Sequence, residues 1–403
     1  MRRIEVTNLD RWVHGFLRRR NIDFQIVYNR GRAPWNEIWQ QALALKDPGL
    51  DLPEAFYADE LDQIVLANGI TNEAEYLRVP RTGRGTPLRR VQRARVWPVF
   101  EDYRLNLLLQ GGKEVDDAYR AAAELLAEDR GGFAYTAAIV DEAQDMGAQA
   151  YRLLRALVPE GPNDLFIVGD GHQRIYGRSR VVLGRCGIRI VGRSHKLRLN
   201  YRTTEETRSW AVRLLDGREI DDLDGGLDDH KGFKSLTHGP SPQVIEFDSG
   251  EQQAEFIVRW LGDLAGSGES LRNTCIVART QAERDSVGQA IAEAGVSSVL
   301  LEQDLPDDAD EDAVRLATMH RVKGLEFDRV IMASVNKGVV PLPKAVQGHA
   351  DDRAREWAET EERALVYVAA TRARKELLVL GHGKASSFVS ADVNRSNPSD
   401  HES

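Results

Sequence analysis

One short segment constrains this chain more than any other: an apolar strand that ends in paired carboxylates. Residues 139–145 read Ile-Val-Asp-Glu-Ala-Gln-Asp, so Asp141 and Glu142 directly follow the last apolar residue. Carboxylates at such a strand end can hold Mg²⁺ and orient or deprotonate an attacking water during phosphoryl transfer. Because an acidic strand end is more often a helix N-cap or a solvated turn, the segment needs support from elsewhere in the chain.

The glycine-rich loop that cradles phosphates beside such a strand is absent from the sequence. No G-x-x-x-x-G-K-[ST] pattern occurs in the 403 residues. The nearest candidates, at 83–86, 111–114 and 383–385, lack the lysine, the Ser or Thr, or the spacing. Residues 4–8 alternate like a strand and 9–20 continue as an amphipathic helix. That opening fits either an ordinary first strand or a chain cut inside a domain.

The composition excludes membrane-spanning and disulfide-stabilised classes. With 42% hydrophobic and 29% charged residues, the chain is globular and has room for two or three domains. The net charge of −9 argues against general polyanion binding by the whole surface but allows a local basic groove. Cys186 and Cys275 lie far apart, as suits a reducing compartment. No apolar run reaches transmembrane length and no signal peptide is present, so we expect a cytoplasmic protein.

Strand and helix patterns alternate along most of the chain, which predicts an α/β fold with two doubly wound parallel sheets. Strands are expected at 24–27, 135–140, 165–169, 196–200, 243–247, 274–278, 297–301, 313–319, 328–335 and 376–380. Helices are expected through much of 31–130, at 148–157, from 204, and at 251–264, 281–294 and 354–373. Thr203 and Glu206 are placed as a capping box for the helix from 204.

Four further segments place polar side chains where a nucleotide would bind in such a fold. They are residues 166–177, 199–203, 318–328 and 367–374. Gln173 can sense a γ-phosphate, and Tyr201 offers a ring on which a base can stack. Arg202 can reach a phosphate, and Arg372 is an arginine-finger candidate. Each segment alone is as readily a turn or a solvated helix, but their joint occurrence in this order is hard to obtain by chance.

Together with residues 139–145, these segments resemble motifs II to VI of superfamily 1 DNA helicases of the UvrD/Rep type. The resemblance covers roughly residues 135–205 and 313–381. It implies two RecA-like domains, the first incomplete and carrying a helical insertion, with ATP and Mg²⁺ in the cleft between them. It also implies single-stranded DNA, or DNA with a 3′ single-stranded tail, lying across both domains.

The resemblance implies roles at the nucleotide for single residues. The implied catalytic residues are Glu142, Gln173, Arg202 and Arg372. The implied cofactor-binding residues are Tyr201, Glu326 and Asp170, and the implied metal ligand is Asp141. Glu142 would be the general base, Tyr201 would stack on adenine and Glu326 would bond the ribose. Arg202 and Arg372 would be paired arginines on the γ-phosphate.

DNA contacts are expected from two places in the sequence. By resemblance, one place comprises Tyr176, Arg178, His320 and Lys323. The other is the basic cluster at 81–95, represented by Arg84, Arg89 and Arg90, for which a solvated helical face is an equal alternative. Arg178 stands where the family commonly has Trp, and a guanidinium stacks less well on bases, which weakens the expected grip on DNA.

The expected domain organisation follows the resemblance. Residues 1–30 are a remnant of the first RecA-like domain, 31–130 the helical insertion and 131–195 the rest of that domain. Residues 196–384 form the second RecA-like domain and 385–403 a disordered tail.

The implied function is that of an ATP-dependent 3′–5′ DNA helicase or translocase, of the kind used in DNA repair. Lacking the phosphate-binding loop, the chain is expected to be inactive alone and to need an upstream or separately encoded N-terminal segment. The alternative is a non-catalytic DNA-binding or interaction protein derived from a helicase. Retention of Glu142, Gln173 and Arg372 favours the enzyme, because these residue types serve no obvious packing role together.

Overall fold

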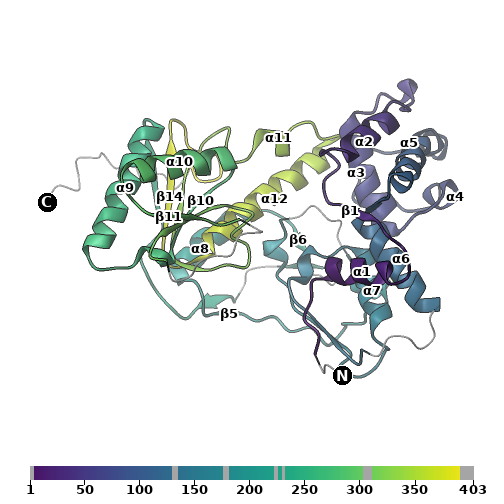
Figure 1. Ribbon diagram of the computed structural model, residues 1–403, viewed down its shortest axis with the longest axis horizontal. Coiled ribbons are helices and arrows are strands. Elements are labelled where there is room, and N and C mark those ends of the chain that lie inside the picture. Colours follow the sequence, from purple (N-terminus) through teal and green to yellow (C-terminus); the bar gives the residue numbers. More distant parts are fainter. Residues whose placement is uncertain are drawn as a thin grey trace.

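The molecule consists of two halves joined by a long helix. The computed structural model describes residues 4–128, 135–175, 181–221, 226–228, 232–302 and 311–390. Helix α12 (Asp352–Ala370) runs from the mostly helical half towards the half that contains the large sheet (Figure 1). In the part of the chain described, no helix combines the length and the apolar composition needed to cross a membrane.

The large sheet has six parallel strands in the order β11-β12-β10-β13-β14-β9, which confirms the predicted α/β class. Its strands are β9 (Gln243–Phe247), β10 (Thr274–Ala278), β11 (Ser298–Leu300), β12 (Val314–Thr318), β13 (Phe327–Met332) and β14 (Ala373–His382). After β10 the chain forms β11 at the edge of the sheet and then β12 beside β10. It then crosses to the other side of β10 to form β13. Ligands bind at the carboxyl ends of strands where the order reverses in this way.

Helices cover both faces of this sheet. Buried Ile257, Leu261, Val287 and Ile291 attach α9 (Gly250–Gly266) and α10 (Gln281–Glu293) to one face. Helices α8 (Glu205–Arg213) and α12 pack on the other face around a second apolar core. The smaller elements of this half are α11 (Pro343–Val346), η6 (Leu271–Asn273), the pair β5 (Leu199–Asn200) and β8 (Lys234–Ser235), and the pair β6 (Ile220–Asp221) and β7 (Leu227–Asp228).

The helical lobe lies within residues 31–110 and has an aromatic core. Its elements are α2 (Trp35–Leu43), η1 (Pro48–Leu50), α3 (Glu54–Glu60), η2 (Leu61–Leu66), α4 (Glu73–Tyr76) and α5 (Arg90–Leu109). Trp97 and Phe100 pack against Tyr76 in this core and are 3% and 0% exposed. The aromatic side chains beside the arginine cluster are therefore core residues and not stacking platforms for bases.

The first α/β unit is small. It contains α1 (Leu9–Arg18), β1 (Gln25–Val27), β2 (Gly112–Glu114), α6 (Val115–Glu128), β3 (Ala138–Val140), η3 (Ala143–Asp145), α7 (Ala148–Leu157), β4 (Leu165–Ile167), η4 (Gly171–Gln173) and η5 (Leu183–Cys186). Strands β3 and β4 form a parallel pair. Ile139 and Phe166 on this pair are 81% and 63% exposed. Parallel strands are normally buried on both faces, so this ribbon presents an unusual apolar surface.

We expect this apolar surface to cause self-association of the purified chain, because exposed apolar strand edges pair with other chains. Ile139→Thr combined with Phe166→Thr should shift the chain from aggregates towards monomer, measured by size-exclusion chromatography with light scattering. Val140→Thr is the matched control, because Val140 is 4% exposed and its replacement should lower stability instead. A monodisperse, cooperatively melting wild-type chain would contradict the expectation and would show that the ribbon needs no cover.

Three local expectations differ from the structure. Residues 4–8 form no strand, because Asn8 caps α1 by accepting hydrogen bonds from the Asp10 and Arg11 amides. Helix α8 is capped by Thr204, one residue later than predicted, while Glu206 bonds to His238 and the Gly239 amide. The start of the expected disordered tail is packed: Phe388 is 8% exposed and lies in the core beneath the large sheet.

Candidate active site

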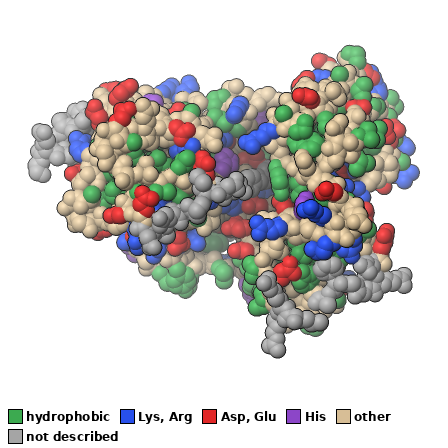
Figure 2. All heavy atoms as spheres, viewed as in Figure 1, with side chains coloured by type: hydrophobic (Ala, Val, Ile, Leu, Met, Phe, Trp, Pro, Cys, Tyr) green, Lys and Arg blue, Asp and Glu red, His purple; other side chains and the backbone are tan. Residues whose placement is uncertain are grey.

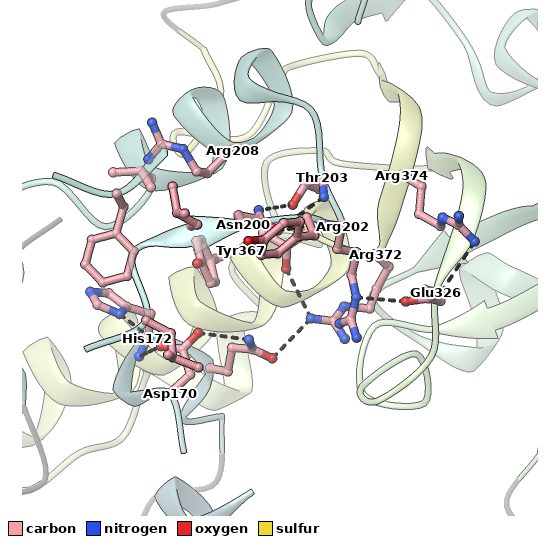
Figure 3. Close-up of a pocket in the computed structure, with 17 residues that line it drawn as sticks. Asp170, His172, Asn200, Arg202, Thr203, Arg208, Glu326, Tyr367, Arg372 and Arg374 are labelled. Carbon is pink, nitrogen blue, oxygen red and sulfur yellow. Dashed lines mark hydrogen bonds and ion pairs between the residues drawn. The ribbon is translucent and has the colours of Figure 1, made fainter. Parts of the chain in front are cut away.

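A cavity of about 560 Å³ opens between the first α/β unit and the large sheet. Its lining is Asp170, His172, Gln173, Leu197, Leu199, Asn200, Tyr201, Arg202, Thr203, Arg208, Val212, Phe233, Glu326, Tyr367, Thr371, Arg372 and Arg374. Figure 3 shows these side chains converging from separate elements. Six of them are residues that the sequence placed at the nucleotide, and they come from four segments that lie far apart in the chain.

Arg372 is the most deeply buried charged group of this cavity. It follows the C-terminal end of α12 and is 1% exposed. Its guanidinium donates to the carbonyls of Val368 and Leu325 at 3.0 and 3.3 Å and to Gln173 Oε1 at 3.1 Å. Burial, and next the charge of Arg202, lower the pKa of Arg372 to about 10, although Glu142 opposes the shift. A buried cation beside a second cation is well placed to receive a polyanion.

Arg202 approaches the same cavity from the turn before α8. Asn200 organises that turn, because its Oδ1 accepts from the Arg202 amide at 2.8 Å and its Nδ2 donates to Thr203 Oγ1. The Arg202 guanidinium pairs with Glu326 Oε2 at 2.8 Å, and both side chains remain 44% exposed. Tyr201 is 73% exposed, so its ring is open to a planar ligand.

Asp170 and Gln173 form the opposite wall on η4. Asp170 caps this turn through the His172 amide at 3.0 Å and accepts from Gln173 Nε2 at 2.9 Å. Burial opposes ionisation of Asp170, but bonds from His172 and Gln173 hold its pKa below the usual value. The geometry thus makes Asp170 the support for Gln173, whose other amide atom faces Arg372.

The carboxylates after β3 lie beside this cavity rather than in its lining. Glu142 adopts a left-handed backbone with φ of 52°, which is uncommon for a residue other than glycine and concentrates at functional sites. Gln144 donates to Glu142 Oε2 and accepts from the Asp170 amide at 2.9 Å. This buried glutamine links the two acidic segments of the first unit, a role that the sequence did not reveal.

Lys323 does not lie on an exposed surface, contrary to its predicted contact with DNA. Its Nζ donates to Asp145 Oδ2 at 2.6 Å and to the Gln173 carbonyl at 2.9 Å. Glu142 Oε2 is 3.7 Å away, and the lysine side chain is only 9% exposed. The ammonium group is therefore committed to the acidic loop of the first unit, residues 141–145.

The predicted DNA contact of Arg84 is also wrong. The Arg84 side chain is 1% exposed and pairs with Glu60, which is fully buried. Arg81 binds both oxygens of the same carboxylate at 2.5 and 2.7 Å, and Tyr76 donates to it as well. A buried carboxylate needs such partners, and Glu60 consequently draws two arginines of the cluster into the lobe.

Of the remaining predicted DNA residues, Arg89 and Arg90 are exposed and stay predictions. Tyr176 and Arg178 lie outside the described residues. His320 lies on the wall of a second cavity.

The second cavity, of about 580 Å³, is at the carboxyl ends of β10 and β12. It is lined by Arg279, Thr280, Gln281, Thr318, His320, Leu342, Lys344 and Ala345. Burial and the charge of Arg279 lower the pKa of His320. Figure 2 shows basic, acidic and His side chains gathered in the hollow between the two halves. Arg279 and Lys344 were missed in the sequence, although Arg279 follows an apolar strand and precedes the Thr280 cap of α10.

The acidic loop fits Mg²⁺. Among the described residues, no group of three His, Cys, Asp or Glu side chains could hold a metal ion alone. Mg²⁺ needs only one or two protein carboxylates, because water and substrate phosphates complete its coordination. Asp141 offers a hard oxygen donor at an exposed position directly after β3. The donor set suits a cation that is shared with a bound polyphosphate.

Two protein-family models match successive parts of the chain, an N-terminal domain followed by a C-terminal domain. The UvrD/REP helicase N-terminal domain matches residues 68–179, and the UvrD-like helicase C-terminal domain matches residues 295–383. The chain belongs to the UvrD-like helicase family. The matched regions contain both acidic segments, the 318–328 loop and Arg372, and the predicted UvrD/Rep-type membership is thereby confirmed.

Curated relatives are DNA helicases by name. A probable DNA helicase from Mycoplasma pneumoniae is 25% identical over 68% of this chain and 46% of its own length. DNA helicase IV from Escherichia coli is 27% identical over 60% of this chain and 33% of its own length. ATP-dependent DNA helicase PcrA from Bacillus subtilis is 33% identical over 23% of this chain and 12% of its own length. This UvrD-like chain thus spans less than half the length of these relatives.

Proposed function

We propose that this UvrD-like chain is the nucleotide- and DNA-binding body of an ATP-dependent 3′–5′ DNA helicase or translocase. The observation that carries the proposal is the cavity between the first α/β unit and the large sheet. It collects Gln173 from one side and Arg202, Glu326 and Arg372 from the other. Groups from two lobes that face one ligand allow that ligand to control how the lobes close. The direction of movement rests on family membership alone.

Each side chain has a task that its chemistry suits. Arg202 and Arg372 stabilise the charge that builds on the terminal phosphate during transfer, while Gln173 senses its presence. The exposed Tyr201 ring, with Leu197 and Leu199 beside it in the cavity lining, offers an apolar platform for a base. Glu142 orients the attacking water. Mg²⁺, held through Asp141 when bound, supplies neutralising charge at the phosphates.

Nucleotide binding is the direct test of this proposal. A fluorescent ATP analogue with Mg²⁺ should bind the wild-type chain saturably, with weak affinity because no glycine-rich loop is present. Arg202→Ala and Arg372→Ala should each weaken binding about tenfold or more, because hydrogen bonds to charged groups are worth about 1.5–3 kcal/mol. Arg355→Ala is the matched control, since Arg355 lies on α12 with its side chain 61% exposed. No saturable binding, or equal affinities for all variants, would refute the proposal.

DNA binding is proposed at the second cavity. Lys344 and His320 line this cavity, and the amino end of α10 adds positive potential. The third basic residue of the lining, Arg279, is paired with Glu362. With a net charge of −9, affinity for single-stranded DNA has to come from such a local site and falls with salt as counterions are released.

We expect weak binding to an oligonucleotide that declines between 50 and 200 mM salt. Lys344→Ala should reduce both the affinity and its salt dependence, measured by fluorescence anisotropy. Lys375→Ala removes an exposed lysine that is paired with Asp328 on the same domain and should have little effect. Salt-independent binding, or equal loss in both variants, would contradict a site at the second cavity.

The alternative function is a non-catalytic DNA-binding or interaction protein. It is favoured by one observation, the absence of a G-x-x-x-x-G-K-[ST] loop in the sequence. Such a protein would retain the salt-sensitive DNA binding and lose the dependence of nucleotide affinity on Arg202 and Arg372. The two titrations above therefore distinguish the alternatives.

A further inference from the structure

Lys323 joins the two lobes at the acidic loop. It lies in the loop between β12 and β13, whereas its partners Asp145 and Gln173 belong to η3 and η4 of the first unit. The Nζ–Oδ2 distance to Asp145 is 2.6 Å, and the Nζ–O distance to the Gln173 carbonyl is 2.9 Å. An ammonium group has three donors and acts as a compact point charge, so it can serve several acceptors at once.

The same short loop touches both cavities. Thr318 and His320 line the second cavity, and Glu326 lines the nucleotide cavity. Lys323 lies between them in sequence and lines neither cavity. Its side chain is 9% exposed and points into the first unit. A direct contact with phosphate or DNA would require Lys323 to give up its ion pair with Asp145 and its bond to the Gln173 carbonyl, so the geometry does not favour such a contact.

Two contacts fix Gln173 to the second domain. Its side chain accepts from Arg372 Nη2 at 3.1 Å and its carbonyl accepts from Lys323. Two separate contacts restrict the movement of Gln173 relative to the second domain more than either contact would alone. Because Asp145 ends the turn that begins after Glu142, Lys323 also fixes that turn relative to Arg372. Misplacing a catalytic group by about 1 Å can cost 10²-fold in rate.

We propose that Lys323 is a positioning residue that holds the acidic loop and Gln173 in register with Arg372. It acts through Asp145, Glu142 and Gln173 and does not touch the nucleotide. The proposal rests on the proposed nucleotide site. In this role, Lys323 helps to fix the position of the first unit relative to the second domain.

The experiment compares Lys323→Met, Lys323→Arg and Asp145→Asn with wild type in two measurements. The first is affinity for the fluorescent ATP analogue with Mg²⁺. The second is the distance between fluorophores on cysteines introduced at Ala156 and Ser267, which are exposed in the first unit and the second domain. The two native cysteines are buried. Lys375→Met is the matched control for loss of a lysine charge from an ion pair.

Lys323→Met should weaken analogue binding about tenfold, within the 5- to 150-fold range usual for coupled sites, and should broaden the distance distribution. Asp145→Asn should act similarly, and the double variant should be no worse than Lys323→Met, because both changes remove one interaction. Lys323→Arg should recover part of the affinity. Far-ultraviolet circular dichroism should be unchanged in every variant.

Two outcomes would overturn the positioning role while leaving the nucleotide site intact. One is normal affinity together with an unchanged distance distribution in Lys323→Met. The other is additive effects when Lys323→Met and Asp145→Asn are combined. A loss of circular dichroism in Lys323→Met, with Lys323→Arg failing to restore binding, would show a purely structural role and also overturn it. Failure of the wild-type chain to bind the analogue is a different result. It would refute the nucleotide site and the positioning role together.

Discussion

Purified without any other polypeptide, the 403-residue chain should hydrolyse ATP more slowly than about 1 s⁻¹, even with saturating DNA. The reason is the absence of a G-x-x-x-x-G-K-[ST] loop, whose amides and lysine neutralise the β- and γ-phosphates. Loss of one preorganised donor typically lowers the rate by about 10²–10³, and here several donors are missing together. A phosphate-release assay measures this directly, and DNA-stimulated turnover above that rate would contradict the prediction.

The complementary experiment supplies the missing loop. A polypeptide with a strand, a G-x-x-x-x-G-K-[ST] loop and a helix should restore turnover when it is fused to the chain or added to it. In the restored enzyme, Glu142→Gln should abolish hydrolysis while leaving analogue binding intact, because the amide cannot take a proton from water. Arg355→Ala serves as the control and should retain turnover. Full activity of Glu142→Gln would show that another group activates the water.

Glu60→Ala should destabilise the helical lobe by about 3–5 kcal/mol, because it removes the buried carboxylate with which two buried guanidinium groups are paired. The Glu60 side chain is 0% exposed, and those of Arg81 and Arg84 are 6% and 1% exposed. Urea denaturation followed by tryptophan fluorescence is suitable, since Trp97 lies in the same core.

Asp47→Ala provides the comparison for the Glu60 prediction. The Asp47 carboxylate pairs with Arg95 at 2.5 Å, but both side chains are much more exposed, at 29% and 41%. Exposed pairs contribute little to stability, so the unfolding midpoint should change only slightly. Equal effects of the two substitutions would show that Glu60 is not the anchor of the cluster.

Local patterns predicted the elements well where neighbours in sequence determine them. The helix at 148–157 and the strands at 243–247 and 274–278 occur with the predicted bounds. Periodicity and flanking turns act over a few residues, and a sequence displays both. The approach of Arg202 to Arg372 could also be predicted, because the ends of neighbouring strands and helices meet at one edge of a doubly wound fold.

Whether an individual charged side chain is buried, and with which carboxylate it pairs, could not be predicted in the same way. Arg84 and Lys323 have the appearance of surface cations in the sequence, yet each is buried against a carboxylate from another element. Glu60 precedes Arg84 by 24 residues and Asp145 precedes Lys323 by 178. No local pattern marks those carboxylates as partners. Burial of a charge depends on which acceptors the tertiary structure brings within reach, and only the fold decides that.

Helix α12 touches three parts of the molecule that lie far apart. Asp351, its N-cap, accepts from Thr86 of the helical lobe at 2.9 Å. Glu362, further along, holds Arg279 of the second cavity at 2.5 and 3.0 Å. Arg372 follows its last turn in the nucleotide cavity.

With 19 residues, helix α12 is about 28 Å long at 1.5 Å per residue. A tilt of about 5° around its Arg372 end would move the Thr86 end by roughly 2.5 Å over that length. Under the proposed role of Arg372, the pivot of this tilt lies in the nucleotide cavity. A small rotation at the Arg372 end would therefore appear as a larger displacement at the end that contacts Thr86 of the helical lobe.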